Sequence, residues 1–195
     1  MPSTVTAPGF QVEIDDTELR QRFSRQRFGR AVNNALRAVG VDYANRLFDG
    51  FKAEGVDPQS GRKGFWPKLK IPAGPTRAGG RTKRGKILKK SGAYLKSVEP
   101  KNARIVIRGN PDNKTMSVRY DQVPDYAQYH ETGVRQTASA RQAAFLRHLG
   151  YLGAHEGSII NMPARRVFVY PPTWRGVSAR IFKRELAKLW ESRNG

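Results

Sequence analysis

Cysteine is absent from the 195 residues of this sequence, and histidine occurs only three times. The lack of cysteine excludes a disulfide framework and thiolate metal ligands. His130 and Glu131 begin like an H-E-x-x-H zinc helix, but Val134 stands where the second histidine belongs. The other histidines, His148 and His155, show no ligand spacing. We therefore expect no metal and no other cofactor, and we expect His130 to pack in the core or to cap a helix.

Long hydrophobic runs are missing as well. No apolar run approaches the roughly 20 residues that a membrane helix needs. Residues 1–9 lack the basic and apolar regions of a signal peptide. The sequence therefore predicts a soluble protein that is not secreted by the usual route and has no membrane partner.

Acidic residues are scarce: 16 Asp and Glu stand against 36 Lys and Arg, which gives a net charge of +20. A charge of this size predicts a polyanionic partner or an acidic protein partner, and it concerns association rather than fold. A solvated basic surface without a partner is the alternative.

The basic residues are densest within residues 55–92, a Gly- and Pro-rich excursion inside what we expect to be a single domain, 1–195. Between Arg62 and Lys90 there are eleven Lys and Arg and no acidic residue. Such a stretch buries little apolar surface and is expected to be mobile when isolated. Its cations are the candidate contacts for DNA or an acidic protein surface: Arg62, Lys63, Lys68, Lys70, Arg77, Arg81, Lys83, Arg84 and Lys86.

Catalytic constellations are also missing. The Gly-rich run 74–82 lacks the Gly-Lys-Ser/Thr ending of a phosphate-binding loop. Asp121 and Asp125 flank a proline-containing turn, where aspartate commonly forms local hydrogen bonds. No set of nucleophile, base and orienting group can be assembled, so we expect that the protein is not an enzyme.

The hydrophobic pattern predicts an α+β fold. It combines a small, mostly antiparallel sheet, a long N-terminal helix packed on that sheet, the basic excursion and a C-terminal helix. The long helix is expected from about residue 18 to about Phe51, with a bend or break at Gly29 or Gly40. The other elements are expected as strands over 10–14, 104–108, 115–120 and 167–170 and as helices over 90–96, 126–132, 139–149 and from about 177.

Two local expectations concern packing. At the base of the excursion Phe65, Trp66 and Leu69 are expected to anchor the chain against the body, with base stacking by Phe65 and Trp66 as the alternative. The short helix over 126–132 is expected to end with Gly133 in a left-handed conformation.

An ordered set of short motifs runs through about the middle 100 residues. It consists of Trp66-Pro67 and Leu69, Ile87-Leu88, Ser91-Gly92, Leu95, Ser97-Val98, Tyr126-Ala127, His130, Gly133, Pro163-Ala164-Arg165 and Phe168. In this order the motifs resemble the phage virion morphogenesis, or tail-completion, family. Two features depart from that family: Arg166 and Val167 stand where it commonly has a proline, and residues 136–160 are long, as if a helix had been inserted.

The resemblance implies a structural virion protein of a tailed bacteriophage, assembled in the host cytoplasm. Such a protein completes the tail or forms part of the neck for head–tail joining, as a ring around the DNA channel, often six-fold. Its partners would be further copies of itself, the tail tube or terminator, head-completion or portal-side proteins, and the DNA in the channel. The residues that carry the resemblance would hold the ring body together: Trp66, Leu69, Gly92, Tyr126, His130, Gly133, Pro163, Arg165 and Phe168.

In particular, residues 126–133 and 162–165 are expected to pack together as one unit. The rival hypothesis is a sequence-nonspecific nucleic-acid-binding protein that acts outside the particle, for which the net charge is the argument. A nuclease is disfavoured for want of an acidic metal cluster. Whether the basic excursion contacts DNA or an acidic protein surface stays open at this point.

Overall fold

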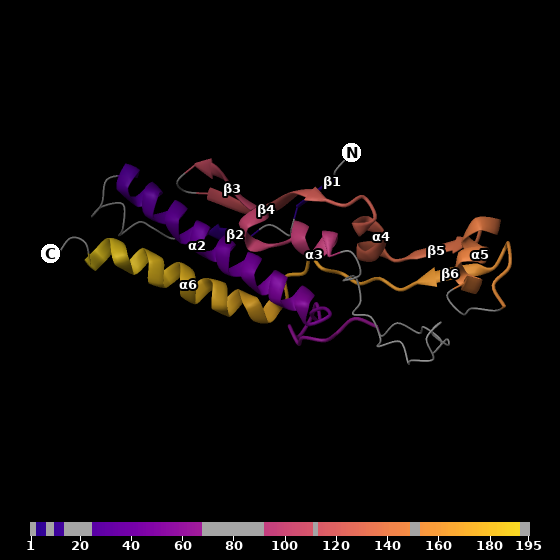
Figure 1. The fold of residues 1–195 in the computed structure, drawn as a ribbon. Coiled ribbons are helices and arrows are strands. Elements are labelled where there is room, and N and C mark those ends of the chain that lie inside the picture. Colours follow the sequence, from indigo (N-terminus) through magenta and orange to yellow (C-terminus); the bar gives the residue numbers. More distant parts are fainter. Residues whose placement is uncertain are drawn as a thin grey trace.

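The fold combines a helical pair, a small sheet and a narrow arm that extends from one end of the molecule (Figure 1). The computed structural model describes residues 3–6, 10–13, 25–67, 92–110, 113–148 and 153–191. Residues 68–91, which make up most of the predicted basic excursion, lie outside these ranges. The arrangement of helices and antiparallel strands confirms the predicted α+β class.

The main sheet is built around one long strand, β4 (Asn113–Val123). One edge of β4 pairs with β3 (Ala103–Asn110) over the whole length of β3. The other edge pairs with β1 (Ser3–Thr6) near Val123 and with β2 (Phe10–Glu13) near Asn113. All these pairings are antiparallel. The predicted hairpin is therefore confirmed, with strands longer than the alternating pattern indicated.

Helix α2 (Arg25–Lys52) covers one face of this sheet. It runs without interruption through both Gly29 and Gly40, so a break at either glycine is ruled out. An added Cβ at Gly40 would lie 3.0 Å from two side-chain carbons of Ile105 on β3. Glycine at position 40 lowers the helix propensity of α2, but it allows the helix to pack closely on the sheet. The predicted start near residue 18 lies outside the described residues.

The core forms along α2, where apolar side chains recur every three or four residues. In the first half of α2, Phe28, Leu36 and Val39 pack with Met116 of β4 and Phe182. Phe182 belongs to α6 (Pro172–Glu191), which lies beside α2 in antiparallel orientation (Figure 1). In the second half of α2 the core is more aromatic, and its buried aromatic members are Tyr43, Phe51, Trp66, Tyr94, Tyr120 and Trp174.

Helix α6 begins at Pro172, about five residues earlier than predicted. Pro171 and Pro172 follow the predicted strand over 167–170, and proline is favoured in the first turn of a helix, where its missing N–H costs nothing. Trp174 is thereby placed within the helix, and its ring meets that of Tyr43 edge-on at 6.0 Å between centroids.

The arm consists of β5 (Val134–Thr137), α5 (Ala140–His148) and β6 (Ile159–Met162). The two strands pair with each other, from Val134 opposite Met162 to Thr137 opposite Ile159. Helix α5 lies at the far end of the arm (Figure 1). Its start is fixed by a capping box, because the Ser139 amide donates to Gln142 Oε1 at 2.9 Å and the Gln142 amide donates to Ser139 Oγ at 3.3 Å. The predicted inserted helix is confirmed, whereas the strands that carry it were not predicted.

Two further sequence predictions are corrected by the structure. Residues 167–170 do not form a strand, although Val167 and Val169 are buried as predicted. Phe65 does not anchor the base of the excursion, because its side chain is 54% exposed. Trp66 alone does so among the described residues, and Leu69 lies outside them.

Candidate functional site: the junction of body and arm

Most of the signature residues that the structure describes meet where the arm joins the body, which we define as β1–β4, α2, α3 and α6. Three pieces converge there: the turn after α2, the short helix α4 (Ala127–Thr132), and the extended segment 163–170 that leads from β6 to α6. A fourth piece, α3 (Ala93–Ser97), contributes Tyr94. The junction is the candidate functional site because it sets the direction of the arm.

Trp66 ties the first piece to the third. Its indole Nε1 donates to the carbonyl oxygen of Arg166 at 3.0 Å, and its ring meets Phe51 edge-on at 5.2 Å between centroids. The backbone of Gly55, at φ 102°, passes directly beneath the indole, so that an added Cβ would lie 2.2 Å from Trp66 Cδ1. Only glycine fits there. The start of the basic excursion is therefore fixed against the segment that follows the arm.

The carboxylate of Glu131 ties α4 to the same segment. It accepts hydrogen bonds from the backbone N–H of Val167 at 2.8 Å, from that of Phe168 at 3.5 Å, and from Tyr94 Oη at 3.0 Å. The Glu131 side chain thus binds the backbone N–H groups of Val167 and Phe168, which a neighbouring strand would otherwise bind. This explains why 167–170 is buried and extended but forms no strand.

Two backbone contacts complete the junction. The amide of Arg165 donates to the carbonyl oxygen of His130 at 2.5 Å. Gly133, which ends α4 at φ 74° and ψ 165°, passes so close to the facing chain that an added Cβ would lie 2.9 Å from Ala164 N and from Met162 O. The φ of Gly133 is positive as expected, but its ψ is extended rather than helical, so the backbone leads straight into β5. The expectation that 126–133 and 162–165 pack together is confirmed.

Aromatic rings fill the space under α4. The Tyr94 ring stacks on the His130 imidazole with centroids 6.4 Å apart, and it meets Tyr126 edge-on at 6.2 Å. Phe168 packs on Tyr120 of β4 at 5.6 Å. These contacts place α4 against the core although the outer edge of Tyr126 remains 40% exposed.

Burial shapes the electrostatics of the junction. Desolvation raises the pKa of Glu131 above its ordinary value, and its hydrogen bonds and Arg166 oppose that rise. Desolvation and the neighbouring Arg165 lower the pKa of His130. Desolvation also raises the pKa of Tyr94, and the charge of Glu131 adds to the effect. Only 4% of Arg165 is exposed, and its Nε has no hydrogen-bond partner. These groups hold the arm in place, and nothing in their arrangement resembles an activated nucleophile.

The remaining signature residues are placed as follows. Pro163 is exposed in the turn between β6 and Arg165, and Gly92 precedes α3 at φ 69°. An added Cβ on Gly92 would meet no atom within 4 Å, so its conformation rather than its size is what favours glycine. Of the predicted contact residues, Arg62 and Lys63 are exposed next to the Trp66 anchor. The others lie outside the described residues: Lys68, Lys70, Arg77, Arg81, Lys83, Arg84 and Lys86.

Sequence reasoning missed the two side chains that matter most for the junction. Glu131 was considered only as a part of a zinc motif, and Tyr94 only as a position in a short helix. One signal was available for Glu131: an acidic residue in the last turn of a short helix has no favourable interaction with the helix dipole. The presence of Glu131 at this position therefore indicates that its carboxylate interacts with residues outside α4.

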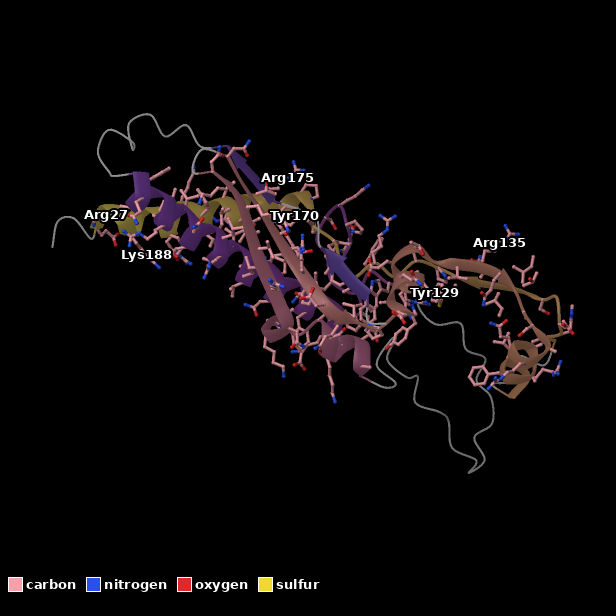
Figure 2. All side chains as sticks on the ribbon, turned by 90° about the horizontal axis from the view of Figure 1, so that it is seen from above. Arg27, Tyr129, Arg135, Tyr170, Arg175 and Lys188 are labelled. Atoms are coloured by element: carbon pink, nitrogen blue, oxygen red, sulfur yellow. The ribbon has the colours of Figure 1, made fainter. Side chains whose placement is uncertain are left out.

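The arm presents apolar side chains to solvent. Phe145 on α5 is 57% exposed and Ile159 on β6 is 61% exposed. Tyr129, at the root of the arm, is 49% exposed, and Figure 2 shows it between the body and Arg135 on β5. These side chains are the exposed apolar groups that the arm offers for a contact with another protein chain.

Within the described ranges, no group of three or more His, Asp or Glu side chains is placed to hold a metal ion. Over the same part of the chain, none of the helices combines the length and apolar character of a membrane span. Comparison of the chain with protein-family models, with curated proteins and with solved structures finds no match in any of the three.

Proposed function

We propose that this chain is a structural protein of a tailed-bacteriophage virion, which completes the tail or forms part of the neck, and that it acts as a homo-oligomeric ring. The observation that carries the proposal is the junction. Two separate segments of the motif set, around His130 and around Arg165, share one hydrogen-bonded unit at the root of a projecting arm. That unit fixes the position of the arm rather than performing a reaction, as we expect of a component of an assembly.

The arm supplies a physical means of assembly. It is a hairpin with a helical tip, and it carries exposed apolar groups well away from the core of its own body (Figure 1). In the proposed ring, Phe145 and Ile159 contact an adjacent subunit or a neighbouring tail or neck protein. Burying such side chains in an interface contributes roughly 1.5–3 kcal/mol each.

The register of the arm offers a clean test. Thr137 stands opposite Ile159, so residues 138–158 can be replaced by Asn-Gly, which closes a two-residue hairpin. We expect the shortened protein to keep the body fold, because the junction is intact. In phage genomes that encode this variant, we expect filled heads and tails that fail to join, or tails that fail to mature, with infectious titre reduced at least 100-fold.

Electron microscopy of the lysate measures this outcome, and Arg135→Gln, an exposed change on the retained part of β5, serves as the control. Normal joined particles from the shortened variant would contradict the assembly role of the arm.

The second candidate is a sequence-nonspecific nucleic-acid-binding protein that acts outside the particle, favoured by the net charge of +20. Light scattering of the purified chain separates the two. A ring has a mass several times 21.9 kDa, whereas a free binding protein is compatible with a monomer.

A further inference from the structure

Positive charge is segregated along the helix pair. In α2, residues 25–40 contain four arginines and no acidic residue, whereas Asp42 and Asp49 both lie in the later part. In α6, residues 175–191 contain five Lys and Arg against two Glu. Because the helices are antiparallel, the basic first half of α2 lies beside the second half of α6. Figure 2 shows Arg27 and Lys188 at the same end of the pair.

The cations of both helices lie opposite the core. On α2 the buried positions include Phe28, Ala35 and Val39, and the exposed cations fall on the other side of the helix. On α6 Phe182 faces inward, and the cations again fall on the outer side. We call this surface the helix-pair face, formed by the exposed residues Arg27, Arg30, Arg37, Arg180, Lys183, Arg184 and Lys188.

Little within the described residues neutralises this face. Glu185, which is half-buried at its edge, lies 3.4 Å from Arg184 and 2.6 Å from Lys188. Glu191 is exposed in the last turn of α6. Leaving Arg27 aside, six cations stand against two carboxylates, which leaves a strongly positive surface, and the mutual repulsion of those cations is relieved when a polyanion binds.

We propose that the helix-pair face binds the phosphate backbone of double-stranded nucleic acid. The residues of this face favour binding of a duplex over binding of a single strand. Single-strand binders combine cations with exposed aromatic rings on which bases stack. The exposed aromatic side chains of the described residues lie elsewhere, namely Phe65, Tyr126, Tyr129 and Phe145. Among the side chains that the structure describes, this two-helix surface carries cations and no exposed aromatic ring, which suits contact with phosphates without reading of sequence.

This inference goes beyond the proposed function and does not depend on it. It assigns binding to ordered helices of the body, whereas the sequence placed all candidate contacts in the excursion. The two proposals can therefore fail separately. The chain could be found in virions and not bind duplex DNA, or it could bind duplex DNA and be absent from virions.

The test is the salt dependence of binding to a labelled 30-base-pair DNA duplex of mixed sequence, followed by fluorescence anisotropy. The helix variant carries Arg30→Gln, Arg37→Gln and Lys183→Gln. The control variant carries Lys96→Gln, Arg135→Gln and Arg141→Gln, which are exposed on α3 and the arm. Both variants lower the net charge by the same three units, and circular dichroism checks that both stay folded.

We expect the slope of log K against log salt concentration to become shallower by roughly 2–3 units in the helix variant, since each phosphate contact contributes about 0.9. The control variant should change the slope by less than one unit. Equal changes in the two variants, an unchanged slope in the helix variant, tighter binding to the unpaired strand than to the duplex, or no binding by the wild type at about 50 mM salt would each overturn the proposal.

Discussion

Replacing Glu131 with alanine is expected to lower the free energy of unfolding by about 3 kcal/mol or more. The carboxylate accepts three hydrogen bonds at the junction, from Tyr94 Oη and from the amides of Val167 and Phe168. Without it, buried donors lose their acceptor, and each unsatisfied group costs roughly 1–3 kcal/mol. Urea denaturation followed by tryptophan fluorescence measures the loss. Because the arm is held by this junction, we also expect faster proteolysis within residues 134–162.

Glu131→Gln is the matched control, because it retains one acceptor oxygen but does not titrate. Burial raises the pKa of Glu131 in the folded protein above its ordinary value of 4.5. The folded state therefore binds more protons than the unfolded state between the two pKa values, and wild-type stability falls as the pH rises across that window. The glutamine variant lacks this term. We expect the wild type to lose stability relative to Glu131→Gln as the pH rises above about 4.5, and a constant difference would contradict burial of the carboxyl group.

Gly133→Val is expected to destabilise the protein by about 3 kcal/mol. The backbone of Gly133, at φ 74° and ψ 165°, lies in a region that is essentially restricted to glycine, and a side chain there costs of order 1–3 kcal/mol. In addition, an added Cβ would lie 2.9 Å from Ala164 N and from Met162 O, which are backbone atoms of the paired strand and the turn after it. Overpacking of this kind costs typically another 1–3 kcal/mol.

Gly153→Val provides the comparison, since an added Cβ at Gly153 would meet no atom within 4 Å. Thermal unfolding of both variants checks the prediction. Equal melting temperatures for the two variants would show that the close approach at Gly133 is not needed by the fold.

The elements that could be predicted from the sequence are those in which apolar residues recur at regular spacing. Helix α2 buries Val32, Leu36 and Val39 at the spacing that its sequence displays, and β4 alternates Met116, Val118 and Tyr120 into the core. In both elements the local pattern and the tertiary packing agree, so the sequence alone predicts the element and its buried face.

The parts that could not be predicted depend on partners that are distant in sequence. Residues 167–170 have the composition of a buried strand, but the amides of Val167 and Phe168 are bound by Glu131, more than 30 positions earlier. Strands β5 and β6 are only four residues long, their sequences do not alternate apolar and polar residues, and none of their residues is fully buried. Phe65 and Trp66 are adjacent and equally apolar, and only the position of Gly55 beneath Trp66 decides which of them is buried.

The candidate site was predictable in its location but not in its mechanism. The motif set drew attention to His130, Gly133 and Arg165, and the structure places these residues together. Their main contributions are made by backbone atoms: the His130 carbonyl, the Arg165 amide and the Gly133 Cα. Side-chain chemistry, which sequence motifs encode most directly, falls instead to Glu131, Tyr94 and Trp66.

The central claim is that this chain is a component of a virion neck or tail, and locating the chain in purified particles tests it most directly. Particles released by cells that carry the gene can be purified, quantified by mass spectrometry and reconstructed by electron cryomicroscopy without imposed symmetry at the neck. We predict that the chain is present at a fixed small copy number, as a ring where head and tail meet, with each arm touching an adjacent subunit or a neighbouring protein. Particles that are complete and infectious but contain none of this chain would contradict the claim.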